Sequence, residues 1–232
     1  MKTKPSTFSF SRLFALLAMG SAALASASIA GDYLPSGKNP LSAASPVETG
    51  FYFEAFGGAL FLDDLSGTGS AGIDAGFDSG WIGGGALGYQ LTPALSLEIE
   101  GATGEADLDS LAVNGANVAG FSGDLTYSQA TVNLIYEFGP QNRITPYAGV
   151  GLGAGFADAD FVYPGARIND DDSAFLYQLI GGVKVDLGPR TEFFAEYRFG
   201  SLDEFTLQRG AGSVVFDELQ SHQVLFGVQI KF

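Results

Sequence analysis

Apolar and polar side chains alternate along the last stretch of the chain, SHQVLFGVQIKF. Glutamines and a lysine occupy one face of this stretch, and large apolar side chains dominate the other. A repeat of two is the period of an extended strand, in which successive side chains point to opposite faces. The pattern therefore predicts a β-strand with one apolar face. That face holds Val224, Phe226, Val228, Ile230 and Phe232.

Seven earlier segments show the same alternation. The clearest covers residues 95–104, where leucine and isoleucine face one way and Ser96, Glu98 and Glu100 face the other. Segments of about ten residues with this alternation are typical of strands in membrane barrels. The other six segments are residues 50–62, 81–91, 126–138, 145–156, 175–187 and 192–200.

The connections between these segments alternate in length. Three are short and contain proline: residues 92–94, 139–143 and 188–190. Four are long and acidic: residues 63–80, 105–124, 157–174 and 201–220. Short turns on one side and long loops on the other, around an even number of strands, are the layout of outer-membrane barrels. A soluble β-sandwich is the alternative, but it does not favour large aromatic side chains at both ends of a continuous apolar face. We therefore predict an all-β fold, an eight-stranded antiparallel up-and-down transmembrane β-barrel over residues 48–232.

The polar faces of these strands are predicted to point into the barrel. A closed sheet pairs every backbone group within hydrocarbon, and the surrounding lipid requires apolar side chains on the outside. Eight strands leave room inside only for side chains. We expect Lys184, Arg198 and Lys231 to bridge among the inward acids, and we favour a structural network over an ion path. The inward acids are Glu54, Glu98, Glu100, Glu137, Glu192 and Glu196.

Residues 1–30 have the three regions of a secretory signal peptide. Lys2, Lys4 and Arg12 precede an apolar run of about a dozen residues, and small residues follow it. We expect cleavage after Ala27 or Ala30. Residues 31–47 are rich in glycine, proline and serine, which predicts a flexible periplasmic lead-in. A buried N-terminal helix is the alternative for the first segment.

Composition excludes several classes of protein. The net charge is −15 with only 11 Lys and Arg, so the chain lacks the basic patch that nucleic acid requires. No segment after the signal has eighteen consecutive apolar residues, so we expect no transmembrane helix there. Cysteine is absent, which excludes disulfides, lipid-modified cysteine and thiolate metal sites.

Two motifs suggest enzymes at first sight. GGGALG at residues 83–88 fits G-x-G-x-x-G, but a dinucleotide site requires a helix next, and the following residues continue a strand into a proline turn. His222 is the sole histidine, and its neighbour Ser221 points to the opposite face of the same strand, so these two residues cannot form a catalytic dyad. A serine from another strand would be needed. We therefore expect no cofactor and no enzymatic activity, with a lipid-modifying enzyme kept as an alternative.

The acidic connections contain weak candidates for a cation site. Oxygen clusters can hold Ca²⁺ or Mg²⁺, but the spacing is not that of an EF-hand. We expect solvated, self-repelling loops, with divalent bridging to lipopolysaccharide phosphates as an intermediate alternative. The candidate ligands are Asp158, Asp160, Asp170, Asp171 and Asp172.

Several stretches resemble the OmpA-like and opacity-type porin families of Gram-negative outer membranes. They are PYAGVGLGAGF at residues 146–156, GGGALGYQL at residues 83–91 and the terminal aromatic strand. The resemblance implies an outer-membrane location and a lipid and lipopolysaccharide environment. It also implies that the barrel-assembly machinery reads Val224, Phe226, Val228, Ile230 and Phe232 as an assembly signal. The function we expect is a structural and surface-interaction role, in which the barrel anchors four acidic extracellular loops that meet a host or cell-surface ligand. A narrow channel for ions or small solutes is the first alternative.

Overall fold

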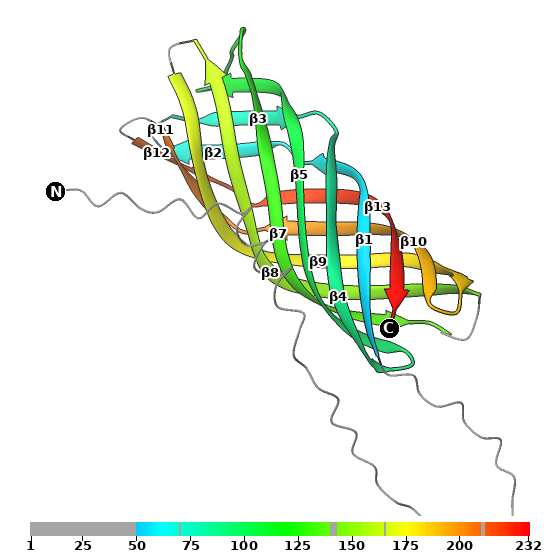
Figure 1. Cartoon of the computed structure of the whole chain (residues 1–232). Coiled ribbons are helices and arrows are strands. Elements are labelled where there is room, and N and C mark those ends of the chain that lie inside the picture. Colours follow the sequence, from blue (N-terminus) through cyan, green and yellow to red (C-terminus); the bar gives the residue numbers. More distant parts are fainter. Residues whose placement is uncertain (1–49, 70, 140–142, 165, 210–211) are drawn as a thin grey trace, which may run out of the picture. The chain divides into compact units, whose positions relative to one another are not determined.

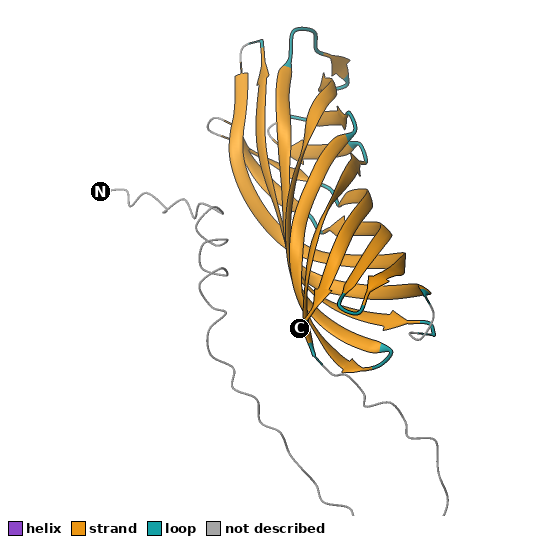
Figure 2. Ribbon diagram, turned by 45° about the vertical axis from the view of Figure 1, so that its right-hand side comes forward, coloured by secondary structure: helices purple, strands orange, loops and turns teal. Residues whose placement is uncertain are grey.

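The computed structural model describes residues 50–69, 71–139, 143–164, 166–209 and 212–232. The expected signal peptide and the whole of the expected lead-in lie outside these residues. Every regular element of the described chain is a strand (Figure 2), and no described helix is long and apolar enough to cross a membrane. Eight strands are long: β1 (Phe51–Leu62), β4 (Gly80–Thr92), β5 (Leu95–Val113), β7 (Ser122–Glu137), β8 (Ile144–Tyr163), β9 (Ala166–Gly188), β10 (Thr191–Leu202) and β13 (Leu219–Lys231).

The eight long strands form a closed antiparallel ring (Figure 1). Each pairs with its neighbour in the order β1, β4, β5, β7, β8, β9, β10, β13. The ring closes because β13 also pairs with β1, with Phe53 opposite Ile230 and Ala59 opposite Val224. This closure leaves no free edge at barrel height. It confirms the predicted eight-stranded, all-β, up-and-down barrel.

The interpretation of the four long connections as solvated loops is wrong for most of the described residues. Strands β5, β7, β8 and β9 continue into them, and five short strands lie there as well. The order β11–β12–β2–β3–β5, with β6 on β5, makes a second sheet at the end of the barrel opposite the C-terminus (Figure 1). We call this second sheet, together with the continuing ends of β5, β7, β8 and β9, the extension. The opposite end of the barrel, with the three short turns, is the turn end. The short strands are β2 (Leu65–Gly69), β3 (Ile73–Phe77), β6 (Ala116–Asn117), β11 (Phe205–Arg209) and β12 (Gly212–Phe216).

The physical reason for the extension lies in an alternation that the acids conceal. On β8, Asp158 and Asp160 alternate with Ala157, Ala159 and Phe161, and these last three are fully buried. The period of two therefore continues past the end of the predicted strand. The acidic residues on the outward face of this part of β8 led to the prediction of a loop, although the inward face of the same residues is apolar.

The barrel is apolar outside and polar inside over its turn-end half. On β5, Leu97 and Ile99 are 42% and 55% exposed, whereas Glu98 and Glu100 are 2% and 3% exposed. The same inversion of the usual soluble pattern is clear on β7, β10 and β13, whereas the inward residues of β4 are mainly isoleucine, alanine and glycine. An apolar outer face is the arrangement that a hydrocarbon surrounding requires.

The interior changes from polar to apolar toward the extension. Along β7 the inward side chains include Asn133 and Gln129 near mid-height and then Tyr127 and Leu125 further up, all buried. Above this level the interior is filled by an apolar cluster, which we call the apolar cap. It holds Leu60, Leu62, Leu65, Ile73, Leu111, Leu125, Phe161, Leu176, Leu202, Leu207, Val214 and Phe216.

Candidate functional site

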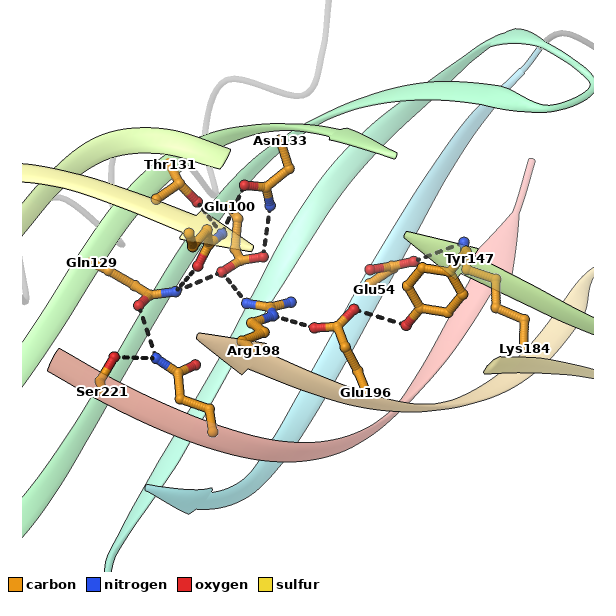
Figure 3. A network of polar contacts seen from close by, with 12 residues as sticks. Glu54, Glu100, Gln129, Thr131, Asn133, Tyr147, Lys184, Glu196, Arg198 and Ser221 are labelled. Carbon is orange, nitrogen blue, oxygen red and sulfur yellow. Dashed lines mark hydrogen bonds and ion pairs between the residues drawn. The ribbon is translucent and has the colours of Figure 1, made fainter. Parts of the chain in front are cut away.

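Arg198 of β10 lies at the centre of the polar interior (Figure 3). Its side chain is 1% exposed, and its guanidinium makes ion pairs with Glu100 and Glu196. The same guanidinium lies 4.7 Å from the centroid of the Phe56 ring, in cation–π contact. Glu196 also accepts a hydrogen bond of 2.7 Å from the Tyr147 hydroxyl. A buried cation is thus held by two carboxylates on different strands.

A layer of amide side chains completes the hydrogen bonding around Glu100. Its carboxylate accepts from Gln129 Nε2 at 2.9 Å and from Asn133 Nδ2 at 3.0 Å. Gln178 Nε2 in turn donates to Asn133 Oδ1 at 2.8 Å, and Gln223 Nε2 donates to Gln129 Oε1 at 3.2 Å. The predicted network named only charged residues as its members, although these amides lie on the polar faces that were predicted to point into the barrel. Their inward position in the alternation was the signal that would have found them.

Lys184 of β9 forms a second centre nearer the turn end. Its ammonium donates to Glu137 Oε1 at 3.0 Å and to Gln229 Oε1 at 2.7 Å, and lies 3.6 Å from Glu54 Oε1. Glu98 accepts a hydrogen bond of 2.7 Å from the Tyr52 hydroxyl. Burial of such groups costs free energy unless they are paired, and here each has a partner.

The third predicted cation, Lys231, lies at the turn-end mouth of the barrel. Its side chain is 34% exposed and its ammonium pairs with Glu192. Glu192 also accepts from Gln229 Nε2 at 2.9 Å. The nine residues assigned to the interior by alternation therefore all face inward, and eight of them are buried. Six acids and three bases make the described network acidic.

Four of the five residues of the expected assembly signal lie on the outward face of β13, and Phe232 directly follows the last residue of that strand. The five residues are 40%, 53%, 38%, 45% and 75% exposed from Val224 to Phe232. The aromatic ring of Phe226 stacks on Phe193 of β10, with 6.3 Å between ring centroids. Their position on an exposed face is compatible with recognition by another protein before the barrel closes.

Replacing Phe232 with serine tests that assembly role. We expect less folded barrel in the membrane fraction, because the terminal ring is the most exposed part of the implied signal, while the purified variant refolds normally in detergent. The measurement compares unboiled gel mobility of membrane fractions with that of refolded protein. Equal membrane amounts for Phe232→Ser and the parent chain would remove the assembly interpretation and leave the barrel unaffected.

An outward surface of carboxylates lies just beyond the apolar band of the barrel. Asp107 is opposite Asp124, Asp124 is opposite Asp160, and Asp158 is opposite Asp171 across neighbouring strands. Like charges directly opposite each other destabilise a sheet. We call this surface the acidic wall. It holds Glu105, Asp107, Asp124, Asp158, Asp160 and Asp171 on β5, β7, β8 and β9.

Asp158 lies on the outward face of β8, just past Phe156, where the apolar band ends on this strand. Its carboxyl is affected by the other acids of the acidic wall. Burial, and then repulsion from Asp171 and Asp124, raise the pKa of the Asp158 carboxyl. A raised folded-state pKa means that the folded state binds this proton more tightly than the unfolded state. The ionised carboxylate therefore costs stability at pH 7, and the cost disappears as the pH falls through the folded-state pKa.

Replacing Asp158 with asparagine should consequently stabilise the fold at pH 7. We expect a gain of about 0.5 kcal/mol at pH 7, and none near pH 3, where both states are protonated. Urea titrations at the two pH values measure it, with the exposed acid Asp64→Asn as the control that shows no gain. A loss of stability at pH 7 would contradict the repulsion in the acidic wall.

The five candidate cation ligands do not converge. Asp158, Asp160 and Asp171 belong to the outward acidic wall, whereas Asp172 faces the other way and accepts from Thr206 N at 2.7 Å. Asp170 is on the same face of β9 as Asp172. Over the residues that the structure describes, no group of three or more histidine, aspartate or glutamate side chains is arranged to hold a metal ion.

His222 lies on the outward face of β13, and Ser221 is buried on the inward face. The imidazole Nδ1 is 2.7 Å from the Tyr197 hydroxyl, and Nε2 is 3.7 Å from Asp63 Oδ1. Within the described chain, no serine hydroxyl is hydrogen-bonded to this ring. An acid, an imidazole and a phenol therefore meet here without the serine that the catalytic alternative needs.

Comparisons with known proteins agree with the closed ring. Residues 13–232 match the family described as the outer membrane protein beta-barrel domain. An outer membrane protein of Gluconacetobacter diazotrophicus is 26% identical over 179 residues, which are 67% of this chain and 47% of that protein. The chain therefore spans about half the length of this curated relative.

Two solved structures have a similar fold. Neisserial surface protein A has a TM-score of 0.50 and 18% identity, and the match covers 78% of this chain and 97% of that one. OprG of Pseudomonas aeruginosa has a TM-score of 0.51 and 16% identity, with 78% and 96% covered. At these identities the likeness concerns the fold alone.

Proposed function

Because the chain belongs to the outer membrane protein beta-barrel family, with its barrel in the bacterial outer membrane, we propose that it is a non-catalytic surface-interaction protein. The barrel anchors the extension outside the cell, and the acidic wall contacts cationic partner surfaces. The turn end faces the periplasm, since short turns are periplasmic and long connections extracellular in such barrels. The observation that carries the proposal is the acidic wall, with directly opposed carboxylates on neighbouring strands.

The extension supports this role by its rigidity. Leu65, Ile73, Leu207, Val214 and Phe216 of the second sheet are each at most 1% exposed and pack in the apolar cap. A folded platform loses less conformational freedom on binding than a flexible loop does. The acidic wall is therefore presented in a fixed geometry.

Charge complementarity indicates the chemistry of the partner. The opposed carboxylates of the acidic wall repel each other in the free protein. A positively charged partner would reduce this repulsion, and this favours its binding. Basic proteins on a host or neighbouring cell are partners of this kind. Polyanions are disfavoured by the same charges.

The two alternative functions have less support. A narrow pore requires a continuous polar path, whereas the apolar cap fills the described interior above Tyr127, and an apolar constriction resists hydration. A lipid-modifying enzyme requires an activated nucleophile, and the serine next to His222 is buried inside the barrel.

Binding of polylysine to the barrel held in lipid nanodiscs tests the proposal. We expect the triple variant Asp107→Asn, Asp124→Asn, Asp158→Asn to associate about tenfold more slowly at low salt. Added salt should remove the difference, because it screens exposed charges.

A second triple variant provides the matched control. Asp64→Asn, Glu204→Gln and Asp217→Asn remove the same charge from exposed positions outside the acidic wall. A smaller effect of this control supports a localised surface. Equal slowing by both triple variants would show that only net charge acts, and would end the proposal.

A further inference from the structure

A cavity of about 460 Å³ opens at the periplasmic end of the barrel, where β1 and β13 meet. Basic, aromatic and amide side chains from three strands and the β9–β10 turn line it. The lining residues that matter here are Phe51, Gln90, Arg190, Lys231 and Phe232. None of them takes part in the surface-interaction role proposed above, and the cavity is at the opposite end of the molecule from the acidic wall.

Backbone hydrogen bonds between the strand ends fix the walls of this cavity. Lys231 N donates to Arg190 O at 2.8 Å, which places the two basic residues side by side. Phe232 N donates to Phe51 O at 3.0 Å, and Gln90 N donates to Gly50 O at 3.0 Å. These bonds join the strand ends around the cavity, and the one to Arg190 O holds the β9–β10 turn against the end of β13.

Arg190 differs from the barrel's internal cations in its pairing. Lys184, Arg198 and Lys231 each pair with a carboxylate. For Arg190, no carboxylate of the described residues lies within ion-pair distance. Glu192 forms the ion pair with the ammonium of Lys231, and its carboxylate also accepts a hydrogen bond from Gln229 Nε2. The guanidinium of Arg190 is consequently left for an external anion, with the partly exposed ammonium of Lys231 beside it.

The same cavity borders the lipid-facing surface. Phe51 and Phe232 are 44% and 75% exposed on the outward side. The Phe51 ring lies 4.8 Å from the Tyr89 ring, and Tyr136 packs on Phe138 at 5.0 Å around the same end of the barrel. Such aromatic belts mark the depth of the lipid headgroups. The cavity thus combines positive charge with apolar surface at headgroup depth.

We propose that this cavity binds the phosphate of an anionic phospholipid in the periplasmic leaflet. The guanidinium of Arg190 donates two hydrogen bonds to phosphate oxygens, in the geometry that arginine favours for this group. The ammonium of Lys231 adds a second positive charge. The acyl chains then lie along the exposed rings of Phe51 and Phe232. Basic pockets at membrane surfaces recognise anionic headgroups in this way.

Native mass spectrometry of the full chain, released from micelles with equal amounts of phosphatidylglycerol and phosphatidylcholine, tests the proposal. We expect one phosphatidylglycerol to be retained in preference to phosphatidylcholine. Arg190→Gln should weaken that preference about fivefold, the factor for one basic residue near an anionic surface. Arg143→Gln is the matched control, because Arg143 is an exposed arginine at the neighbouring β7–β8 turn that does not line the cavity, and it should leave the preference unchanged.

Three outcomes would overturn the lipid site. Equal loss of the preference with Arg190→Gln and Arg143→Gln would show that general charge at this end is enough. No preference in the parent chain would show that the cavity does not select an anionic headgroup. Displacement of the lipid by millimolar inorganic phosphate would assign the cavity to a soluble anion instead. Unboiled gel mobility confirms that each variant is folded before it is measured, so that a lost preference reports the site itself.

Discussion

Replacing Arg198 with methionine lowers the free energy of unfolding by about 3–5 kcal/mol, the usual cost of removing one partner from a buried ion pair. The variant leaves the carboxylates of Glu100 and Glu196 without their cation in the barrel interior. Urea titration of the barrel in lipid vesicles measures the loss. Fluorescence of Trp81, the single tryptophan, and unboiled gel mobility report unfolding independently.

A matched variant separates this effect from the loss of any arginine. Arg190→Met removes the same side chain from an exposed turn position and should change stability by less than about 0.5 kcal/mol. Adding Glu100→Gln and Glu196→Gln to Arg198→Met should recover part of the loss, since two buried charges are then neutralised. A loss below about 0.5 kcal/mol for Arg198→Met would contradict the central place of this ion pair.

Replacing Gly153 with alanine is expected to cost about 1–3 kcal/mol, although it adds a single carbon atom. Gly153 faces inward on β8, where an added Cβ would come within 2.0 Å of Ala130 O and 2.8 Å of Thr131 Cα on β7. These are backbone atoms, so no rotation of a side chain relieves the clash. The same urea titration measures the cost.

Gly181 on β9 provides the matched control for this prediction. A Cβ there meets nothing within 4 Å, because Gly181 lies on the outward face of the barrel. We expect Gly181→Ala to stay within about 0.5 kcal/mol of the parent chain. Equal costs at the two positions would show that the clash at Gly153 is relieved by strand movement.

The barrel could be predicted because its signal is local. Alternation within ten residues decides which side chains face outward, and this placed Glu98, Lys184 and Arg198 on the inward face without any knowledge of their partners. The partners depend on register between strands distant in the sequence. Alternation therefore could not show that Arg198 pairs with Glu100 across 98 positions, or that Lys231 pairs with Glu192.

The extension could not be predicted from charge and composition, although its alternation was present. Asp158 and Asp160 suggested a solvated loop, while Ala157 and Phe161 between and beyond them continued the apolar face inward. The apolar cap was missed for a related reason, since a polar interior was assumed for the full height of the barrel. The inward glycines of β8 leave room for long side chains. At Gly151 that room is taken by Asn133 and Gln178 from the two adjacent strands rather than from opposite ones.

A planar-bilayer recording on the purified full-length chain tests the central claim most directly, that the barrel is a sealed anchor for the extension. The apolar cap closes the described interior above the polar network of Arg198, so we expect a silent baseline over a wide range of voltage. Regular single-channel steps from the folded parent barrel would contradict a sealed anchor and favour the narrow pore.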